Sequence, residues 1–407
     1  MSEVSKRVVI TGINLITALG LDLEKSWENL VAGRSGTKKI TLFDTSDHAT
    51  KIAAELPPEF DDYAKNYCKK YLAKQMARST KMCFVCTKEA VRNSNIDFGK
   101  FDKSRCGVIF GLVGTGYSSQ DILKDSKNLI IKTMSNAVSA WVSIEYKLEG
   151  PSYTVSTACS SAAYAIANGY DLIKLNKCDL VIVGGGSSGV NPDEIRGFND
   201  LFALSTRNDE PEKASRPFSI DRDGFVMGEG AGILILESEE SARSRGAEIH
   251  AEMLGYALTT EAYNIISPQK DGVGMARTME LALKNAGVRK EEVDYINAHG
   301  TSTGLNDKYE TMAVKRVFGE LAYKVPISSV KSMIGHTISA AGGVEAIITI
   351  MSMKNNIITP TINYNPDPEL DLDYVPDKAR EKKISTAISN SFAFGGHNAC
   401  LVFRKYK

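Results

Sequence analysis

The sequence predicts an α/β fold in which sheets and helices are stacked in layers. Short β-branched runs alternate with longer helical segments along almost the whole chain. The strand-like runs are apolar throughout rather than at every second position, which suits strands covered on both faces. No strict repeat of about 20 to 50 residues is present, and this argues against a solenoid. Together these patterns indicate helices packed on both faces of buried sheets.

The predicted elements follow one another in a regular order. Buried strands are expected at 7–11, 107–110, 153–156, 180–183, 232–236, 249–256, 295–297 and 384–388. Helices are expected between them, at 162–175, 274–285 and 344–354 among others. The strand and small-residue turn at 153–163 (YTVSTACSSAA) is echoed at 387–399 (AISNSFAFGGHNA). This echo suggests two related halves that face one another.

Composition excludes several classes of protein. The 407 residues contain 49 Lys and Arg against 49 Asp and Glu, so there is no global field for nucleic acid or an anionic membrane. The apolar runs are shorter than the roughly 18 to 20 residues that span a bilayer. Seven cysteines without a framework spacing, and no signal-peptide pattern at the N-terminus, predict a reducing cytoplasm.

Two motifs are interpreted as structural. Gly184-x-Gly186-x-x-Gly189 follows an apolar strand like a dinucleotide-binding fingerprint, but Pro192 disfavours the helix that would hold a pyrophosphate. A tight structural turn is the better interpretation. Cys83-x-x-Cys86 has no second ligand pair, so we expect two partly buried helix cysteines and no metal.

Cys159 is the first candidate for chemistry. It follows the apolar strand at 153–156 and precedes the small residues Ser160 to Ala163. Such residues allow a helix to start at the cysteine, where the helix dipole would lower the thiol pKa. The pattern is similar to a nucleophile elbow with sulfur in place of oxygen. A buried structural cysteine is an equally good reading of this segment alone.

Two histidines strengthen the catalytic interpretation. His299 ends a strand and enters the loop GTSTG, and His336 lies just past the strand-like run near Ser328. Imidazoles of near-neutral pKa can donate hydrogen bonds to a carbonyl that becomes an enolate or an oxyanion. Two of the five histidines in the chain lie in such turns. Together with Cys159, they favour a shared catalytic site.

These segments resemble the Cys–His–His β-ketoacyl-acyl carrier protein synthases, the condensing enzymes of the thiolase fold. The resemblance covers almost the whole chain and rests on STACSSA, STRNDEPEKASRPFSIDRDGFVMGEGAG, INAHGTSTGLNDKYET, SSVKSMIGHTISAAGGVEAI and SNSFAFGGHN. It implies a five-layer α/β/α/β/α internal duplication. We expect an N-terminal half at 1–250 with the nucleophile and a C-terminal half at 251–407 with both histidines.

The resemblance implies a decarboxylative Claisen condensation. Cys159 would accept an acyl group, and His299 and His336 would hold the thioester carbonyl of malonyl-carrier protein while CO₂ leaves. No cofactor of its own is implied, because the substrates are carried on the phosphopantetheine arm of acyl carrier protein.

Supporting roles are implied in the same way. The backbone N–H groups of Cys159 and Phe394 would form the oxyanion hole, and Phe394 would also gate the acyl pocket. Lys331 would support the second histidine with Glu345 as its buried acidic partner. The hydroxyl groups of Thr301 and Thr303 would bind the pantetheine arm.

Three departures from the family pattern concern the gate and the pathway. Ala393 and His397 replace a glycine and a threonine of the usual gating loop, Gly304 replaces a frequent proline, and the segment at 111–159 is shortened. The last departure favours a specialised type II polyketide or polyene pathway over fatty-acid elongation. The partner subunit would be an identical chain or a homologous chain-length factor. Two other functions are considered. One is that of a thiolase, for which Cys400 is the available candidate for a second catalytic cysteine. The other is that of a non-catalytic chain-length factor.

An acidic carrier protein needs a basic docking face. The segment at 68–81 carries cations without an acid and is expected to form a basic helix, although such a run is often only a solvated face. Its charged residues are Lys69, Lys70, Lys74, Arg78 and Lys81.

Overall fold

The computed structural model describes residues 6–124 and 127–407, in which ten strands form one continuous sheet. The order across the sheet is β10-β9-β13-β14-β8-β1-β7-β6-β4-β5. These strands are β1 (Val8–Thr17), β4 (Cys106–Gly111), β5 (Ser152–Val155), β6 (Leu180–Ser188), β7 (Glu229–Ser238), β8 (Ala251–Thr260), β9 (Tyr295–Asn297), β10 (Ile327–Ser328), β13 (Thr386–Phe392) and β14 (His397–Arg404). All eight predicted strands are present, and most of them extend beyond their predicted ends.

The sheet consists of two five-stranded halves with the same topology. In each half two antiparallel pairings are followed by two parallel ones, in the orders β1-β7-β6-β4-β5 and β8-β14-β13-β9-β10. The halves meet where Val8–Ile10 of β1 pair with Ala251–Met253 of β8. The predicted internal duplication is therefore confirmed. The sequence echo was wrong in detail, because β5 corresponds to β10 in this topology, not to β13.

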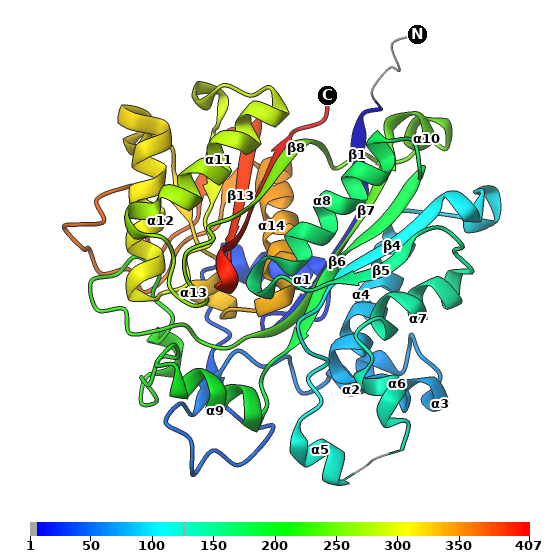
Figure 1. The fold of residues 1–407 in the computed structure, drawn as a ribbon, viewed down its shortest axis with the longest axis horizontal. Helices are drawn as coiled ribbons and strands as arrows, with labels where there is room; N and C mark the ends of the chain where they lie inside the picture. The colour runs from blue at the N-terminus through cyan, green and yellow to red at the C-terminus, as the bar shows by residue number, and fades with distance from the viewer. Residues whose placement is uncertain (1–5, 125–126) are drawn as a thin grey trace.

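Helices complete five layers (Figure 1). The central helices α8 (Ser161–Lys174) and α14 (Ala341–Asn355) contact each other, and each packs against strands of both halves. One outer layer contains α4 (Arg78–Asn93) and α7 (Ala137–Tyr146), and the other contains α11 (Val273–Ala286) and α12 (Gly304–Phe318). Because both sheet faces are covered, the central strands β1, β6 and β7 are buried at every position. None of the described helices is long and apolar enough to span a membrane.

Shorter elements lie mainly around the rims of these layers. The helices are α1 (Leu23–Val31), α2 (Phe60–Ala64), α3 (Lys70–Ala73), α5 (Ser119–Lys124), α6 (Leu129–Thr133), α9 (Pro192–Asp200), α10 (Glu239–Ser244) and α13 (Lys331–Ile334). Two further strand pairs are formed by β2 (Lys38–Lys39) with β3 (Ile52–Ala53), and by β11 (Ile357–Ile358) with β12 (Arg380–Glu381).

Two sequence interpretations are corrected by the fold. Gly184 and Gly186 lie inside β6 rather than in a turn, and helix α9 does begin at Pro192. A proline at the first helical position loses no hydrogen bond, and the Asn191 side chain caps the helix by accepting from the Glu194 N–H at 3.0 Å. The cysteines of the C-x-x-C motif both lie in helix α4, as predicted, but they are fully rather than partly buried.

Candidate active site

Cys159 lies at the junction between β5 and α8. It belongs to the 3₁₀ turn Ala158–Ser160, and Ala158 before it has a φ of 50°, a left-handed conformation that a non-glycine residue adopts at a cost. The turn fits because Gly111 at the end of β4 leaves room for the start of α8: a Cβ there would lie 2.3 Å from the carbonyl carbon of Ser161. Close packing thus fixes the position of the thiol.

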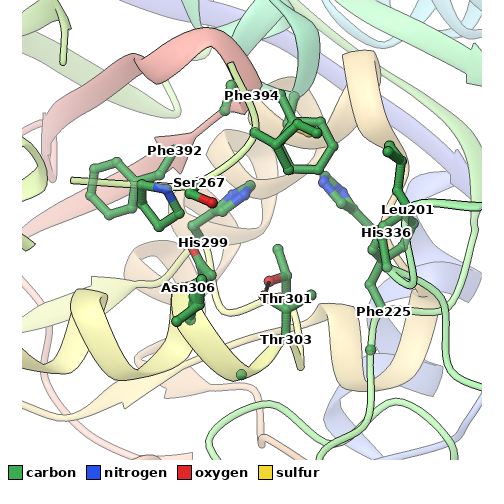
Figure 2. A pocket seen from close by; sticks show the side chains of 18 of the residues that line it. Leu201, Phe225, Ser267, His299, Thr301, Thr303, Asn306, His336, Phe392 and Phe394 are labelled. Atoms are coloured by element: carbon green, nitrogen blue, oxygen red, sulfur yellow. Dashed lines mark hydrogen bonds between the residues drawn. The ribbon is translucent and has the colours of Figure 1, made fainter. Parts of the chain in front are cut away.

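Cys159, His299 and His336 converge on one site. The sulfur of Cys159 and a ring nitrogen of each histidine all lie within 4.8 Å of one another. The two imidazole centroids are 5.3 Å apart, with the rings at 83°. Figure 2 shows both rings directed into the same space, with Phe394 on one side of it and Thr301 and Thr303 on the other.

The site opens into a cavity of about 310 Å³. It is lined by residues of both halves of the sheet, which explains why the predicted motifs lie so far apart in the sequence. Its lining includes Cys159, both histidines, Phe225, Phe392 and Phe394. Thr301 and Thr303 also line it, and their hydroxyl oxygens are 2.9 Å apart. Six of the predicted site residues are therefore brought together.

Lys331 and Glu345 form a buried ion pair directly behind His299. The Lys331 Nζ donates to the carboxylate of Glu345 and to the carbonyl oxygen of His299, the latter at 2.6 Å. It also lies 3.5 Å from Nδ1 of His299. Since an ammonium group cannot accept a hydrogen bond, this contact favours the tautomer of His299 that carries its proton on Nε2. The sequence placed Lys331 behind the second histidine, but its contacts are with the first.

Burial keeps both imidazoles neutral. It lowers the pKa of His299 well below its usual value, and the charge of Lys331 lowers it further. The pKa of His336 is lowered by the same two causes, in the same order. Both ring nitrogens of His336 lack a hydrogen-bond partner among the described residues. One neutral imidazole is thus oriented by Lys331, and the other is free to bind a ligand.

The thiol of Cys159 is not activated in the way its sequence position suggested. Burial raises its pKa to about 11, although Lys331 and the backbone N–H of Phe394 each oppose this. The expectation of a lowered pKa was wrong because desolvation of the thiolate outweighs the helix terminus and the nearby cation.

Alkylation of Cys159 by iodoacetamide should therefore accelerate with pH. The thiolate is the reacting form, so we expect the rate to rise by about tenfold per unit from pH 7 to pH 10. Mass spectrometry of the alkylated peptide would measure this rate, with Cys159→Ala as the blank. A rate that levels off between pH 7 and pH 8 would contradict the raised pKa.

Two acidic residues that the sequence analysis did not single out hold the loop after His299. Asp307 accepts hydrogen bonds from the N–H groups of Thr301 at 2.9 Å and Ser302 at 3.1 Å. Glu310 accepts from the N–H groups of His299 at 2.9 Å and Gly300 at 2.8 Å. Their spacing of three residues on α12 was the available signal, because residues at i and i+3 share a helix face.

Phe394, for which the sequence predicts a gating role, lies on a loop that is tied to a second loop. The N–H of Gly395 donates to the carbonyl of Ile265 at 2.7 Å, and Gly395 has a φ of 80°. Ala393 has a φ of −118°, an extended conformation that needs no glycine. The Phe394 ring lies 6.4 Å from that of Phe198, between centroids. In this conformation, alanine at position 393 therefore causes no backbone strain.

Removing only one member of the Lys331–Glu345 pair should destabilise the protein. Lys331→Met leaves a buried carboxylate uncompensated, which costs about 3 to 5 kcal/mol. Burial already raises the pKa of Glu345 to about 7, so the folded variant binds a proton that the unfolded chain releases. The loss should therefore grow as the pH rises from about 5 to 8. Urea denaturation across this range would measure it.

The double variant Lys331→Met/Glu345→Leu is the matched control. It has no buried charge at this position and should recover most of the lost stability. A double variant as unstable as Lys331→Met would show that shape, rather than charge, determines the loss.

The predicted basic helix is not present as such. Lys69 to Lys81 span α3, a break at 74–77 and the start of α4. Arg78 forms two hydrogen bonds with the buried Glu229, at 2.7 and 2.9 Å, and Lys81 pairs with Asp61 at 2.7 Å. The exposed lysines Lys69, Lys70 and Lys74 remain, without an ion pair in the described part of the chain.

The fold and the site define a class of protein, the thiolase-fold condensing enzymes that transfer acyl groups. The sequence models of the β-ketoacyl synthase N-terminal and C-terminal domains match residues 5–242 and 250–365. The chain is 41% identical to 3-oxoacyl-[acyl-carrier-protein] synthase 2 of Synechocystis sp. over 99% of each chain. It is 42% identical to the synthase of the same name from Rhizobium meliloti, over 98% of this chain and 99% of that one. The chain belongs to the β-ketoacyl synthase family.

Two solved structures of similar shape extend this comparison. The ishigamide ketosynthase/chain length factor superposes with a TM-score of 0.92 at 33% identity, over 99% of this chain and all of that one. A type II polyketide synthase ketosynthase, bound to a hexaketide and in complex with its acyl-carrier protein, gives a TM-score of 0.89 at 30% identity with the same coverage.

Proposed function

We propose that the protein is a β-ketoacyl-acyl carrier protein synthase, which lengthens a carrier-bound acyl chain by two carbons. The observation that carries this proposal is the convergence of Cys159 and the neutral imidazoles of His299 and His336 on one buried cavity. A thiol and two hydrogen-bond donors are the groups that acyl transfer and enolate stabilisation require.

The first half-reaction loads the enzyme. The sulfur of Cys159 attacks the thioester carbonyl of an acyl-carrier protein, and the bond between that carbonyl and the pantetheine sulfur breaks. The thiol proton of Cys159 ends on the departing pantetheine thiol. The backbone N–H groups of Cys159 and Phe394 hold the oxyanion; both groups favour negative charge on the sulfur by lowering the pKa of the thiol, which supports this role.

The second half-reaction forms the new carbon–carbon bond. The carboxylate of malonyl-carrier protein leaves as CO₂, and its bonding electrons pass into the thioester as an enolate. His299 and His336 donate hydrogen bonds to the enolate oxygen. The enolate carbon then attacks the acyl group on Cys159, whose carbon–sulfur bond breaks, and the released thiolate takes up one proton from water to restore the thiol. Because decarboxylation supplies the carbanion, we propose neither a strong base, nor a metal, nor an organic cofactor of the protein's own.

The surrounding residues have positioning roles in this proposal. Lys331, held by Glu345, sets the tautomer of His299, and the hydroxyl groups of Thr301 and Thr303 bind the pantetheine arm. Phe394 is the gate, and its place in the lining of the cavity supports this role. We keep residue 250 as the boundary between the halves, which is supported by β8 starting at Ala251.

We propose a type II pathway, with a preference for polyketide or polyene assembly over fatty-acid elongation. The shortened 111–159 segment and the ishigamide ketosynthase/chain length factor support this preference, whereas the relatives named synthase 2 fit either pathway. We also propose a cytoplasmic location and an identical or homologous partner subunit. Exposed apolar side chains beside the edge strand β5, including Ile130, Ile144 and Tyr153, support such a partner.

The two rival functions have less support. A thiolase would need a second cysteine in the site, but Cys400 is buried on β14, does not line the cavity, and has a pKa raised by burial. A non-catalytic chain-length factor would not need the Cys–His–His constellation.

The test is to offer acyl-carrier protein with malonyl-carrier protein and, in parallel, the two coenzyme A thioesters. We expect the 3-oxoacyl-carrier protein and one CO₂ per turnover, both measured by mass spectrometry. A preference for coenzyme A substrates would favour a thiolase. Absence of any condensation with either pair would overturn the proposed function.

Reversing the charge of Lys69, Lys70 and Lys74 should weaken encounter with an acidic carrier protein. We expect the association rate to fall about tenfold at 50 mM NaCl and the effect to vanish at 500 mM, because salt screens exposed charges. Stopped-flow binding measures this rate. An unchanged association rate at low salt would show that these lysines take no part in docking. The control variant is Lys290→Glu, on the C-terminal half.

A further inference from the structure

The three reactive side chains of the cavity are also a set of metal ligands. The sulfur of Cys159 and one ring nitrogen each of His299 and His336 lie within 4.8 Å of one another. Within residues 6–124 and 127–407, no other trio of His, Cys, Asp or Glu side chains is arranged in this way. Thiolate and imidazole are ligands that Zn²⁺ prefers, whereas Mg²⁺ and Ca²⁺ need oxygen ligands. The donor set therefore fits Zn²⁺.

The spacing of these atoms is close to that of a tetrahedral site. With a Zn–S bond of about 2.3 Å and Zn–N bonds of about 2.0 to 2.1 Å, the ligand atoms of such a site are about 3.3 to 3.6 Å apart. The sulfur and the two ring nitrogens therefore need to approach one another by at most about 1.5 Å. Small rotations of three side chains on three separate segments can supply this movement.

His336 independently indicates a ligand at this place. It is 2% exposed, and neither of its ring nitrogens has a hydrogen-bond partner among the described residues. Its ring is held by edge-to-face packing on Phe225, with the centroids 5.3 Å apart, and no hydrogen bond opposes its rotation. Burial lowers its pKa, which keeps the imidazole in the neutral form that binds metal ions. Because a buried polar atom without a partner is costly, a ligand at this nitrogen is favoured.

We propose that Cys159, His299 and His336 form a zinc-binding site, at which Zn²⁺ reversibly inhibits the enzyme. The inhibition rests on the proposed function, but the binding does not. Zn²⁺ bonds to the sulfur of Cys159 and displaces the thiol proton to water, with no transfer of electrons. A water molecule completes the four ligands. The bound thiolate cannot attack a thioester, and the bound imidazoles cannot donate to an enolate oxygen, so one ion blocks both half-reactions.

The ammonium group of Lys331 weakens this site. His299 binds the metal through Nε2, because its Nδ1 faces the Nζ of Lys331 at 3.5 Å. Binding at Nε2 moves the imidazole proton to Nδ1, directly toward the ammonium group. The contact that favours a proton on Nε2 in the free enzyme therefore opposes the metal. We expect the ion to leave when the concentration of free zinc falls.

Cobalt substitution tests the binding without any turnover. Co²⁺ held by a thiolate and imidazoles in a tetrahedral site gives a thiolate-to-metal charge-transfer band, which hydrated Co²⁺ lacks. We expect the chain to bind one Co²⁺ with this band and Zn²⁺ to displace it. Cys159→Ala should lose the band, and His336→Ala should bind Co²⁺ at least about tenfold more weakly. Cys400→Ala, whose cysteine is also buried, should titrate like wild type.

Lys331→Met/Glu345→Leu tests the role of the ammonium group. This double variant removes the cation beside Nδ1 without leaving a buried carboxylate uncompensated. We expect it to bind Co²⁺ about tenfold more tightly than wild type, because Nδ1 can then take up the proton. Unchanged or weaker binding would overturn the assignment of Nε2 as the ligand atom.

Loading of Cys159 from acyl-carrier protein is the second measurement. At a saturating concentration of Zn²⁺ we expect the loading rate to fall at least about tenfold and EDTA to restore it. The site is overturned if wild type gives no charge-transfer band or if the band persists in Cys159→Ala. Undiminished loading by a chain that shows the band would overturn the inhibition. Failure of the proposed function is distinct, because the chain would then fail to load even in EDTA, whereas the cobalt titration would be unaffected.

Discussion

We expect Cys159→Ala to abolish the acyl adduct and to lower condensation by at least about 10³-fold, the scale typical of removing a covalent nucleophile. No other described cysteine lines the cavity, so no thiol can replace it. Intact-mass spectrometry after mixing with acyl-carrier protein measures the adduct directly. The expected spectrum of the variant shows only the unmodified chain.

Cys400→Ala is the control for this result. This cysteine is equally buried but lies in β14, so its variant should keep the adduct on Cys159. An adduct of undiminished mass and yield on Cys159→Ala would mean that another residue is the nucleophile.

Replacing His299 or His336 by Ala should separate the two half-reactions. Each variant loses one hydrogen bond to the enolate oxygen, and we expect CO₂ release from malonyl-carrier protein to fall by about 10² to 10³. Loading of Cys159 should fall much less, because in the proposed mechanism the oxyanion of that step is held by the backbone N–H groups of Cys159 and Phe394. Release of ¹⁴CO₂ from labelled malonyl-carrier protein and the yield of acyl adduct are the two measurements.

His336→Gln tests the same role with an N–H donor retained. We expect it to release CO₂ faster than His336→Ala. In the wild type, lowering the pH from 7 to 6 should leave CO₂ release nearly constant, because burial keeps both imidazoles neutral throughout this range. Wild-type decarboxylation rates in both alanine variants would contradict the assignment.

The sequence was informative where one segment determines its own structure. Strands covered on both faces are continuously apolar, so β6 and β9 could be located from their composition alone. The placement of Cys159 before a helix could be predicted from the small residues that follow it. The convergence with two distant histidines, however, depended on resemblance to a family, because no local pattern determines how the two halves of the sheet meet.

The errors have a common physical cause, which is a partner far away in the sequence. Arg78 was assigned to a free basic face, but it pairs with Glu229, 151 residues later. The thiol pKa of Cys159 was expected to fall because only its own helix was considered, whereas burial by other segments raises it. Gly184 and Gly186 were assigned to a turn because glycine is common there, yet in β6 they allow close packing: a Cβ on Gly184 would lie 2.0 Å from the carbonyl oxygen of Gly232.

The central position of β1 has a consequence for synthesis in the cell. Residues 8–17 leave the ribosome early, but their neighbours β7 and β8 begin only at residues 229 and 251. At about 5 to 20 residues per second, this strand, which is buried along its whole length in the folded protein, waits about 10 to 50 s with both edges unpaired. An unpaired strand edge is a template for aggregation. We therefore expect translation stalled before residue 260 to yield insoluble fragments.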